Sequence, residues 1–130
     1  MTKALFIAYL VSILHGTSTL STLTNQQLDH MHHAYTQAIR YGVDPEKVIL
    51  LGNCESKWVK TASGDYRSET GEYMARGIFQ WWRASWSKYS NDYGLSGDRL
   101  DPYDNIDLTI KVLADGGEKN WYNCWKSINE

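Results

Sequence analysis

Glu55 is the residue in this chain whose type and position best suit chemistry. It follows a nearly continuous apolar run from Val48 to Cys54, within a stretch that ends at Trp58. A carboxyl group in apolar company costs free energy unless it is paired or kept protonated. At the carboxyl end of a helix, the helix dipole also disfavours an anion. Because a protonated carboxyl group can donate its proton in a reaction, we predict that Glu55 is a general acid.

A second set of carboxyl groups follows in the stretch from Thr61 to Met74, which has no clear periodicity and reads as a loop. It carries Asp65, Glu69 and Glu72. Loops of this length in compact domains are often functional. Asp65 is therefore the candidate for a second catalytic carboxylate, although ordinary solvation of a surface loop explains it equally well.

Helical patterns surround Glu55 on both sides. Thr24 to Gln27 has the form of a capping box, and apolar residues follow it at helical spacing until Tyr41-Gly42. Asp44 and Pro45 then begin the helix that ends near Glu55. We expect two adjacent helices here, the second of them buried on most sides.

The second half of the chain also reads as helical. Phe79, Trp82 and Trp86 fall on one helical stripe. A further helix is expected to begin at Asp104 as N-cap and to end at Gly116-Gly117, and a short one should close the chain. The longest stretch with strand periodicity spans only four residues, so we predict a mainly α domain.

Composition narrows the possible ligands. The formal charge of -2 gives no uniform basic field, which argues against binding nucleic acid through its phosphates. The chain has nine Tyr and six Trp but only two Phe, and aromatic rings with a polar handle suit the stacking of sugars. The expected stacking residues are Trp81, Tyr103 and Trp121, whereas Trp82 and Trp86 are expected in the core. His30, His32 and His33 are interpreted as solvated.

The N-terminal residues resemble an export signal. Lys3 precedes a short apolar run that ends at Leu14, and small polar residues follow. We expect a leader over residues 1–18, a linker over 19–23 and a catalytic domain over 24–130, with the mature protein secreted or periplasmic. The alternatives are an N-terminal core helix or a retained signal anchor.

Cys54 and Cys124 are the only cysteines in the chain. An even cysteine count behind an export signal predicts one disulfide, and two buried free thiols are the alternative. Two isolated cysteines cannot complete a tetrahedral metal site, so we expect no metal.

Three motifs in order carry a family resemblance. Glu55-Ser56 is followed by a segment from Ala75 to Gln80 with the pattern Ala-x-Gly-Ile-Phe-Gln, and then by Asp-Pro-x-x-Asn-Ile over residues 101–106. Together they resemble the lysozyme-like superfamily of lytic transglycosylases, goose-type lysozymes and phage endolysins. The resemblance covers roughly residues 44–125. It implies a mainly α lysozyme-like single domain of about five to seven helices with long cleft loops.

The resemblance also implies an activity. Glu55 would protonate the β-1,4 glycosidic oxygen between N-acetylmuramic acid and N-acetylglucosamine in peptidoglycan. Ser56, Gly77 and Gln80 match motif positions near the substrate. Asp65 would be needed only for hydrolysis with inversion, because lytic transglycosylases close the sugar onto its own hydroxyl.

This chain departs from the family pattern at one position, and another kind of function stays open. Leu113 stands near the position where many transglycosylases carry a tyrosine, which favours the lysozyme interpretation. We expect no cofactor, a monomer, and glycan strands of peptidoglycan as the partner. The alternative function is a non-catalytic lysozyme-fold module that binds glycan or protein.

Overall fold

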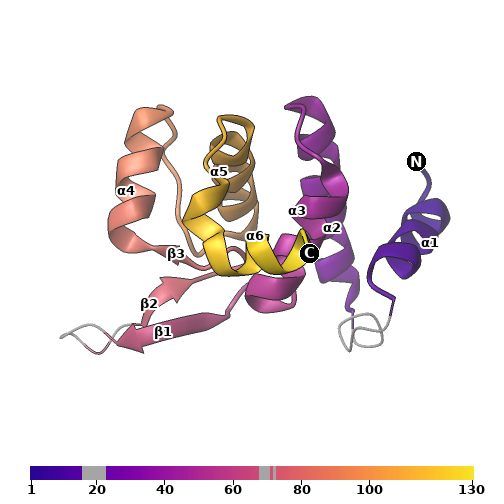
Figure 1. Ribbon diagram of the computed structural model, residues 1–130, viewed down its shortest axis with the longest axis horizontal. Coiled ribbons are helices and arrows are strands. Elements are labelled where there is room, and N and C mark those ends of the chain that lie inside the picture. The colour runs from indigo at the N-terminus through magenta and orange to yellow at the C-terminus, as the bar shows by residue number, and fades with distance from the viewer. Residues whose placement is uncertain (16–22, 68–70, 72) are drawn as a thin grey trace.

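A computed structural model describes residues 1–15, 23–67, 71 and 73–130, with the backbone alone for residues 65–67. Six α-helices and a small sheet make up this part of the chain, which confirms the mainly α prediction (Figure 1). The helices are α1 (Lys3–Ile13), α2 (Asn25–Arg40), α3 (Pro45–Ser56), α4 (Arg83–Asp92), α5 (Pro102–Ala114) and α6 (Tyr122–Ile128). A 3-10 turn, η2 (Glu118–Trp121), leads directly into α6.

The helix starts follow from capping chemistry. At α2 the predicted capping box is present, because Thr24 accepts from the Gln27 backbone N–H and the Gln27 side chain accepts from the Thr24 N–H. At α3 the Asp44 side chain accepts from the N–H of Glu46, and Pro45 occupies the first turn. The prediction of α2 and α3 is therefore confirmed.

The predicted start of α5 was wrong by three residues. Its N-cap is Asp101, whose carboxylate accepts from the N–H groups of Tyr103 and Asp104. Pro102 then stands in the first turn, where its missing N–H costs nothing. The Asp-Pro pair is thus a helix start, and Asp104 lies inside the helix.

The segment predicted as a long loop, residues 61–74, contains one strand and the start of another in a three-stranded antiparallel sheet. The strands are β1 (Ser63–Arg67), β2 (Tyr73–Arg76) and β3 (Trp81–Trp82), in the order β1-β2-β3. Gly64 pairs with Ala75, which in turn pairs with Trp82. Strands this short, with an irregular register in β1, leave no alternating pattern that sequence could reveal.

The predicted helical stripe through Phe79 was also wrong at its start. Gln80 has φ 53°, a left-handed conformation that stops a helix, and Trp82 is only the N-cap of α4. Phe79 is therefore in a turn, and of the three stripe residues only Trp86 lies inside the helix.

The core lies among the long helices. Figure 1 shows α2, α3, α4 and α5 standing side by side, with the sheet along their lower ends and α6 crossing in front. α2 packs against both α3 and α5, and α6 packs against α3. Several core side chains are completely buried, among them Ile49, Trp58, Phe79 and Ile106. α6 thereby packs on α3, the helix whose last turn contains Glu55.

The N-terminal apolar run forms α1, which packs beside α2. Phe6 and Leu10 are buried, and the Phe6 ring contacts the Tyr35 ring edge-on at 5.6 Å. Leu5 and Val11 on the same helix are exposed. None of the helices in the described ranges has the length and apolar character needed to cross a membrane. The role of α1 as an export leader stays a prediction.

Two of the three histidines of α2 are not simply solvated, whereas His32 is exposed as predicted. His30 is 2% exposed, and its Nδ1 has no hydrogen-bond partner among the described residues. His33 is paired through Nε2 with Asp107 of α5 at 2.6 Å. The sequence hid this pair because Asp107 is 74 residues away. Burial, followed by the charge of Lys60, lowers the pKa of His30 below its usual 6.5.

We predict that His30 makes the protein less stable in acid. Its folded pKa lies below the unfolded value, so its neutral form is retained without cost above about pH 6.5 and stability falls as the pH drops toward the folded pKa. Urea unfolding of the wild type, His30→Gln and His32→Gln at about pH 7.5 and pH 5 measures this. His32 is the exposed control on the same helix. Equal acid losses in wild type and His30→Gln would contradict the prediction.

Candidate active site

Glu55 occupies the last turn of α3 and is half-buried. The chain reverses directly after the helix through Lys57 (φ 54°) and Trp58 (φ 61°), two successive non-glycine residues in left-handed conformations. Such conformations cost of order 1–3 kcal/mol each and persist only where the surroundings hold them. The turn beyond Glu55 must therefore be held by packing.

The Trp58 ring supplies that packing. It is completely buried, and its Nε1 donates to the Ile49 carbonyl of α3 at 3.0 Å. A Cβ built on Gly52 would lie 2.6 Å from two ring carbons, so only glycine leaves room for the ring against the helix. The ring also meets Phe79 edge-on at 5.6 Å. Trp58 thus connects the end of the Glu55 helix to the turn that contains Phe79.

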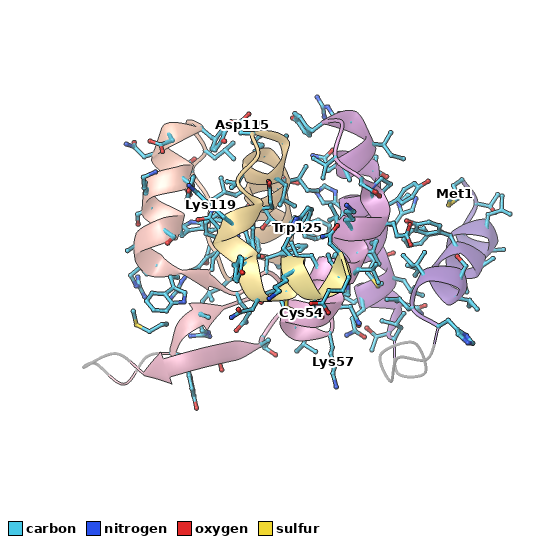
Figure 2. All side chains as sticks on the ribbon, viewed as in Figure 1. Met1, Cys54, Lys57, Asp115, Lys119 and Trp125 are labelled. Carbon is cyan, nitrogen blue, oxygen red and sulfur yellow. A yellow bond between two sulfur atoms is a disulfide. The ribbon has the colours of Figure 1, made fainter. Side chains whose placement is uncertain are left out.

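A disulfide holds the last turn of α3 from its other side. Cys54 and Cys124 are bonded, as predicted. In α6, which the structure describes along its whole length, no residue is buried. Lys47 lies over the Trp125 ring at 5.6 Å, which adds a cation–π contact between α3 and α6. Trp125 and Ile128 are partly buried against the core, and the disulfide adds a covalent link beside Glu55. Figure 2 shows Cys54 at the edge of α6 and Trp125 within it.

The Gly-Ile-Phe-Gln turn is held by Asn105 of α5. The buried Asn105 side chain accepts from the Phe79 N–H at 2.9 Å and donates to the Arg99 carbonyl at 2.8 Å. Gly77 has φ 85°, and a Cβ there would lie 2.4 Å from Asn105 Nδ2. The glycine is therefore required both for its backbone conformation and for the close approach of Asn105. This pairing brings the second and third motifs into contact in the fold.

Gln80 ties this turn to the sheet. Its Nε2 donates to the carbonyls of Ala62 at 3.1 Å and Gly77 at 2.8 Å. A Cβ on Gly64 would lie 2.6 Å from Gln80 Oε1, so the carboxamide packs against β1 beside Asp65. Asp65 itself lies in β1, but its side chain is outside the described part, as are Glu69 and Glu72.

The tryptophans are arranged differently from our expectation. Trp81, expected to stack on sugars, is 3% exposed, and its Nε1 donates to Thr109 at 2.8 Å. Trp82, expected in the core, is half-exposed. Successive strand residues point to opposite faces, so burying Trp81 turns Trp82 outward. Trp86 is buried as expected.

Trp121 is also largely buried. Its Nε1 donates to the Phe79 carbonyl at 2.8 Å, and its ring meets Trp81 edge-on at 5.3 Å. Together with Gln80, both tryptophans line a small cavity whose other walls are Trp82, Ser85 and Asn120. Sequence reasoning missed Ser85 and Asn120 because one belongs to the first turn of α4 and the other to η2, far apart in the chain.

Ser56 and Tyr103, both expected near the substrate, do not line the cavity at Gln80. The Ser56 hydroxyl donates to the Gly52 carbonyl at 3.3 Å, a local bond that satisfies a carbonyl of α3. The Tyr103 ring packs edge-on against His30 and His33 of α2. Their substrate-binding roles stay predictions.

Comparison with known proteins gives one match. A family model described as the transglycosylase SLT domain matches residues 32–128. No curated protein and no solved structure is significantly similar to the chain. The match includes Glu55, the Gly-Ile-Phe-Gln turn and the whole of α5.

We predict that Gly52→Ala destabilises the protein although alanine favours helices. Moving the Trp58 ring away from the new Cβ costs about 1–3 kcal/mol, which outweighs the gain of up to ~1 kcal/mol in helix propensity. Denaturant unfolding of Gly52→Ala, Trp58→Phe and the double variant tests this through a double-mutant cycle. The smaller phenyl ring that Trp58→Phe introduces should relieve the clash. An equal cost of Gly52→Ala in both backgrounds would refute the contact.

We predict that the double variant Cys54→Ser/Cys124→Ser loses about 4 kcal/mol of unfolding free energy, because the bond closes a loop of 70 residues. Urea unfolding measures the loss. The wild type in excess dithiothreitol is the control, since it lacks the bond but keeps both cysteines. A loss below about 1 kcal/mol in both samples would contradict the predicted stabilisation.

Proposed function

The chain belongs to the transglycosylase SLT domain family, and from this premise we propose that it cleaves the β-1,4 bond between N-acetylmuramic acid and N-acetylglucosamine in peptidoglycan, with Glu55 as the general acid. The observation that carries the proposal is the position of Glu55 within the matched region. It is a half-buried carboxyl group in the last turn of α3, next to a disulfide and a turn fixed by Trp58. Such a rigidly held position suits a carboxyl group that must reach one particular oxygen atom of a substrate.

The first step is proton transfer. Glu55 gives its proton to the glycosidic oxygen while the bond from that oxygen to the anomeric carbon breaks. The leaving sugar departs with a neutral hydroxyl group. Positive charge develops on the anomeric carbon and the ring oxygen of the muramic acid, and Glu55 becomes a carboxylate.

The second step follows one of two routes. In transglycosylation the C6 hydroxyl of the same muramic acid attacks the anomeric carbon, and the Glu55 carboxylate takes its proton, which gives a 1,6-anhydro end. In inverting hydrolysis the two steps coincide, because a water attacks the opposite face of the sugar ring as the bond breaks and a second carboxylate takes its proton. Asp65 is our candidate for that second carboxylate, because β1 packs against the Gln80 carboxamide at the neighbouring Gly64.

The proposed substrate also implies a cellular location for the protein. Peptidoglycan lies outside the cytoplasm, where disulfides persist, so the Cys54–Cys124 bond fits an exported protein. We propose that the N-terminal residues direct this export.

We predict that Glu55→Gln lowers the rate of wall cleavage by about 10²–10⁴-fold, because glutamine has no proton to give. Clearing of a suspension of bacterial walls measures the rate. Glu46→Gln is the matched control, since Glu46 is an exposed glutamate in the first turn of the same helix. Circular dichroism must show that both variants fold. Full clearing by Glu55→Gln would reject the assignment.

Mass spectrometry of the same digests identifies the second step. Anhydro ends are lighter than reducing ends by one water. A reducing-end digest that Asp65→Asn abolishes supports the hydrolytic route, whereas anhydro ends that persist in Asp65→Asn support a single catalytic carboxylate. Binding to walls without any soluble fragment would instead favour a non-catalytic module.

A further inference from the structure

A cavity separate from the one at Gln80 lies where the first two turns of α2 meet the segment that follows α3. It has a volume of about 180 Å³ and is lined by Thr24, Gln26, Gln27, His30, Trp58, Val59 and Lys60. One buried water needs roughly 10–15 Å³ of such space, so a small organic group fits here. The two cavities share no lining residue, and a ligand in this one is therefore held by a different set of side chains.

One wall of this cavity contains a buried histidine with an unpaired nitrogen. The His30 side chain is almost completely buried, and no described residue forms a hydrogen bond with its Nδ1. The Tyr103 ring of α5 lies edge-on to the imidazole at 5.2 Å, so the imidazole is packed between helices. Because buried polar atoms are nearly always hydrogen-bonded, an unpaired nitrogen beside a cavity points to a partner that enters the cavity.

Lys60 is the single charged residue among the seven that line this cavity. Within the described part of the chain, its ammonium group makes no hydrogen bond or ion pair. Two carboxylates act electrostatically on His30, from Asp29 of α2 and from Asp101 at the start of α5, and His33 acts in the opposite sense. Neither carboxylate lines the cavity, and Asp101 already accepts from two N–H groups of α5. Lys60 therefore keeps its positive charge available for a ligand.

The first turn of α2 adds a second source of positive potential. Thr24 and Gln27 satisfy each other's backbone N–H groups in the capping box, whereas the N–H of Gln26 donates to no described residue. The N-terminus of a helix carries a partial positive charge, and its free N–H groups bind anions. Together with Lys60, this terminus favours a ligand group that carries one negative charge.

The cavity is bounded on another side by the turn that follows Glu55. The Gln27 side chain donates through Nε2 to the Trp58 carbonyl at 3.2 Å, which joins the first turn of α2 to this turn. Val59 follows with an exposed apolar side chain. A carbon chain attached to the bound anionic group can lie against Val59 without burying a polar atom.

We propose that this cavity binds a carboxylate group, with Lys60 pairing with its charge and the Gln26 N–H and the His30 imidazole donating hydrogen bonds to its oxygens. A carboxylate carries one negative charge and accepts several hydrogen bonds at once, which matches one ammonium group and two neutral donors. Free small acids and peptide C-termini both carry this group. The inference does not depend on the proposed function, because it concerns binding alone.

NMR titration of the full chain labelled with ¹⁵N tests the site. The probes are acetate and N-acetylglycylglycine, and N-acetylglycylglycinamide is the matched probe without a carboxylate. We expect both acids to shift the Gln26 amide and His30 ring signals saturably, and the amide probe to bind at least about tenfold more weakly than its acid. Equal affinities of the two acids would identify a site for free small acids, whereas tighter binding of the dipeptide would identify a site for peptide C-termini.

A pair of lysine variants tests the charge. Lys60→Gln should weaken binding of the acids at least about tenfold, because it removes a charge-assisted hydrogen bond. Lys126→Gln removes the same charge from an exposed position of α6 and should leave the affinity unchanged. Circular dichroism must show that both variants fold. No saturable shift with either acid, equal binding of the dipeptide and its amide, or unchanged affinity in Lys60→Gln would overturn the proposal.

The ionisation of His30 gives a further readout. A bound carboxylate stabilises the imidazolium form, so saturation with either acid should raise the pKa of His30. By linkage, the acids should bind more tightly as the pH falls toward that pKa. NMR pH titration of the histidine ring signals with and without the acid measures this, and the exposed His32 serves as the control. A pKa of His30 that is unchanged at saturation would contradict its place in the site.

Discussion

The packing of Trp58 beneath α3 is the contact on which the rest of the site depends. The ring lies against Gly52, donates to the Ile49 carbonyl and meets Phe79. It thereby supports the two left-handed residues that turn the chain away from the helix directly after Glu55. Without this packing the end of the helix would fray, and the candidate acid would not be held in one position. Here the end of α3 is part of the core.

Buried polar groups hold the turn at Phe79, which the Trp58 ring contacts. Asn105 clamps the turn at Phe79, and the indole of Trp121 donates to the Phe79 carbonyl. Each bond satisfies a backbone group in a turn that has no regular ladder to pair it. The disulfide at Cys54 then joins the segment after Trp121 to the helix of Glu55. The Glu55 helix, the turn and the C-terminal segment form one connected frame.

Two regions lie on this frame. Glu55, the proposed acid, is at the end of α3, and a small cavity without charged lining residues lies between Trp82 and Asn120. Several residues of the family motifs serve the frame itself. Gly77 and Asn105 pack against each other, and Gln80 bonds backbone carbonyls at the foot of the sheet. Their spacing in sequence reflects these contacts.

Local signals in the sequence determined α2, α3 and the candidate acid. The capping box at Thr24, the Asp-Pro start at residue 44 and the apolar run before Glu55 each act within a few residues, so sequence revealed them. The two cysteines also left few alternatives. Only the tertiary structure decided features that depend on distant partners. Several features arise between segments that are separated in the chain. They are the short sheet at β1 and β2, the burial of Trp81 with Trp82 turned outward, the pairing of His33 with Asp107, and the proximity of Ser85 and Asn120. All of these features have the same physical reason. They depend on packing against residues that are distant in sequence, and no local sequence pattern predicts such packing.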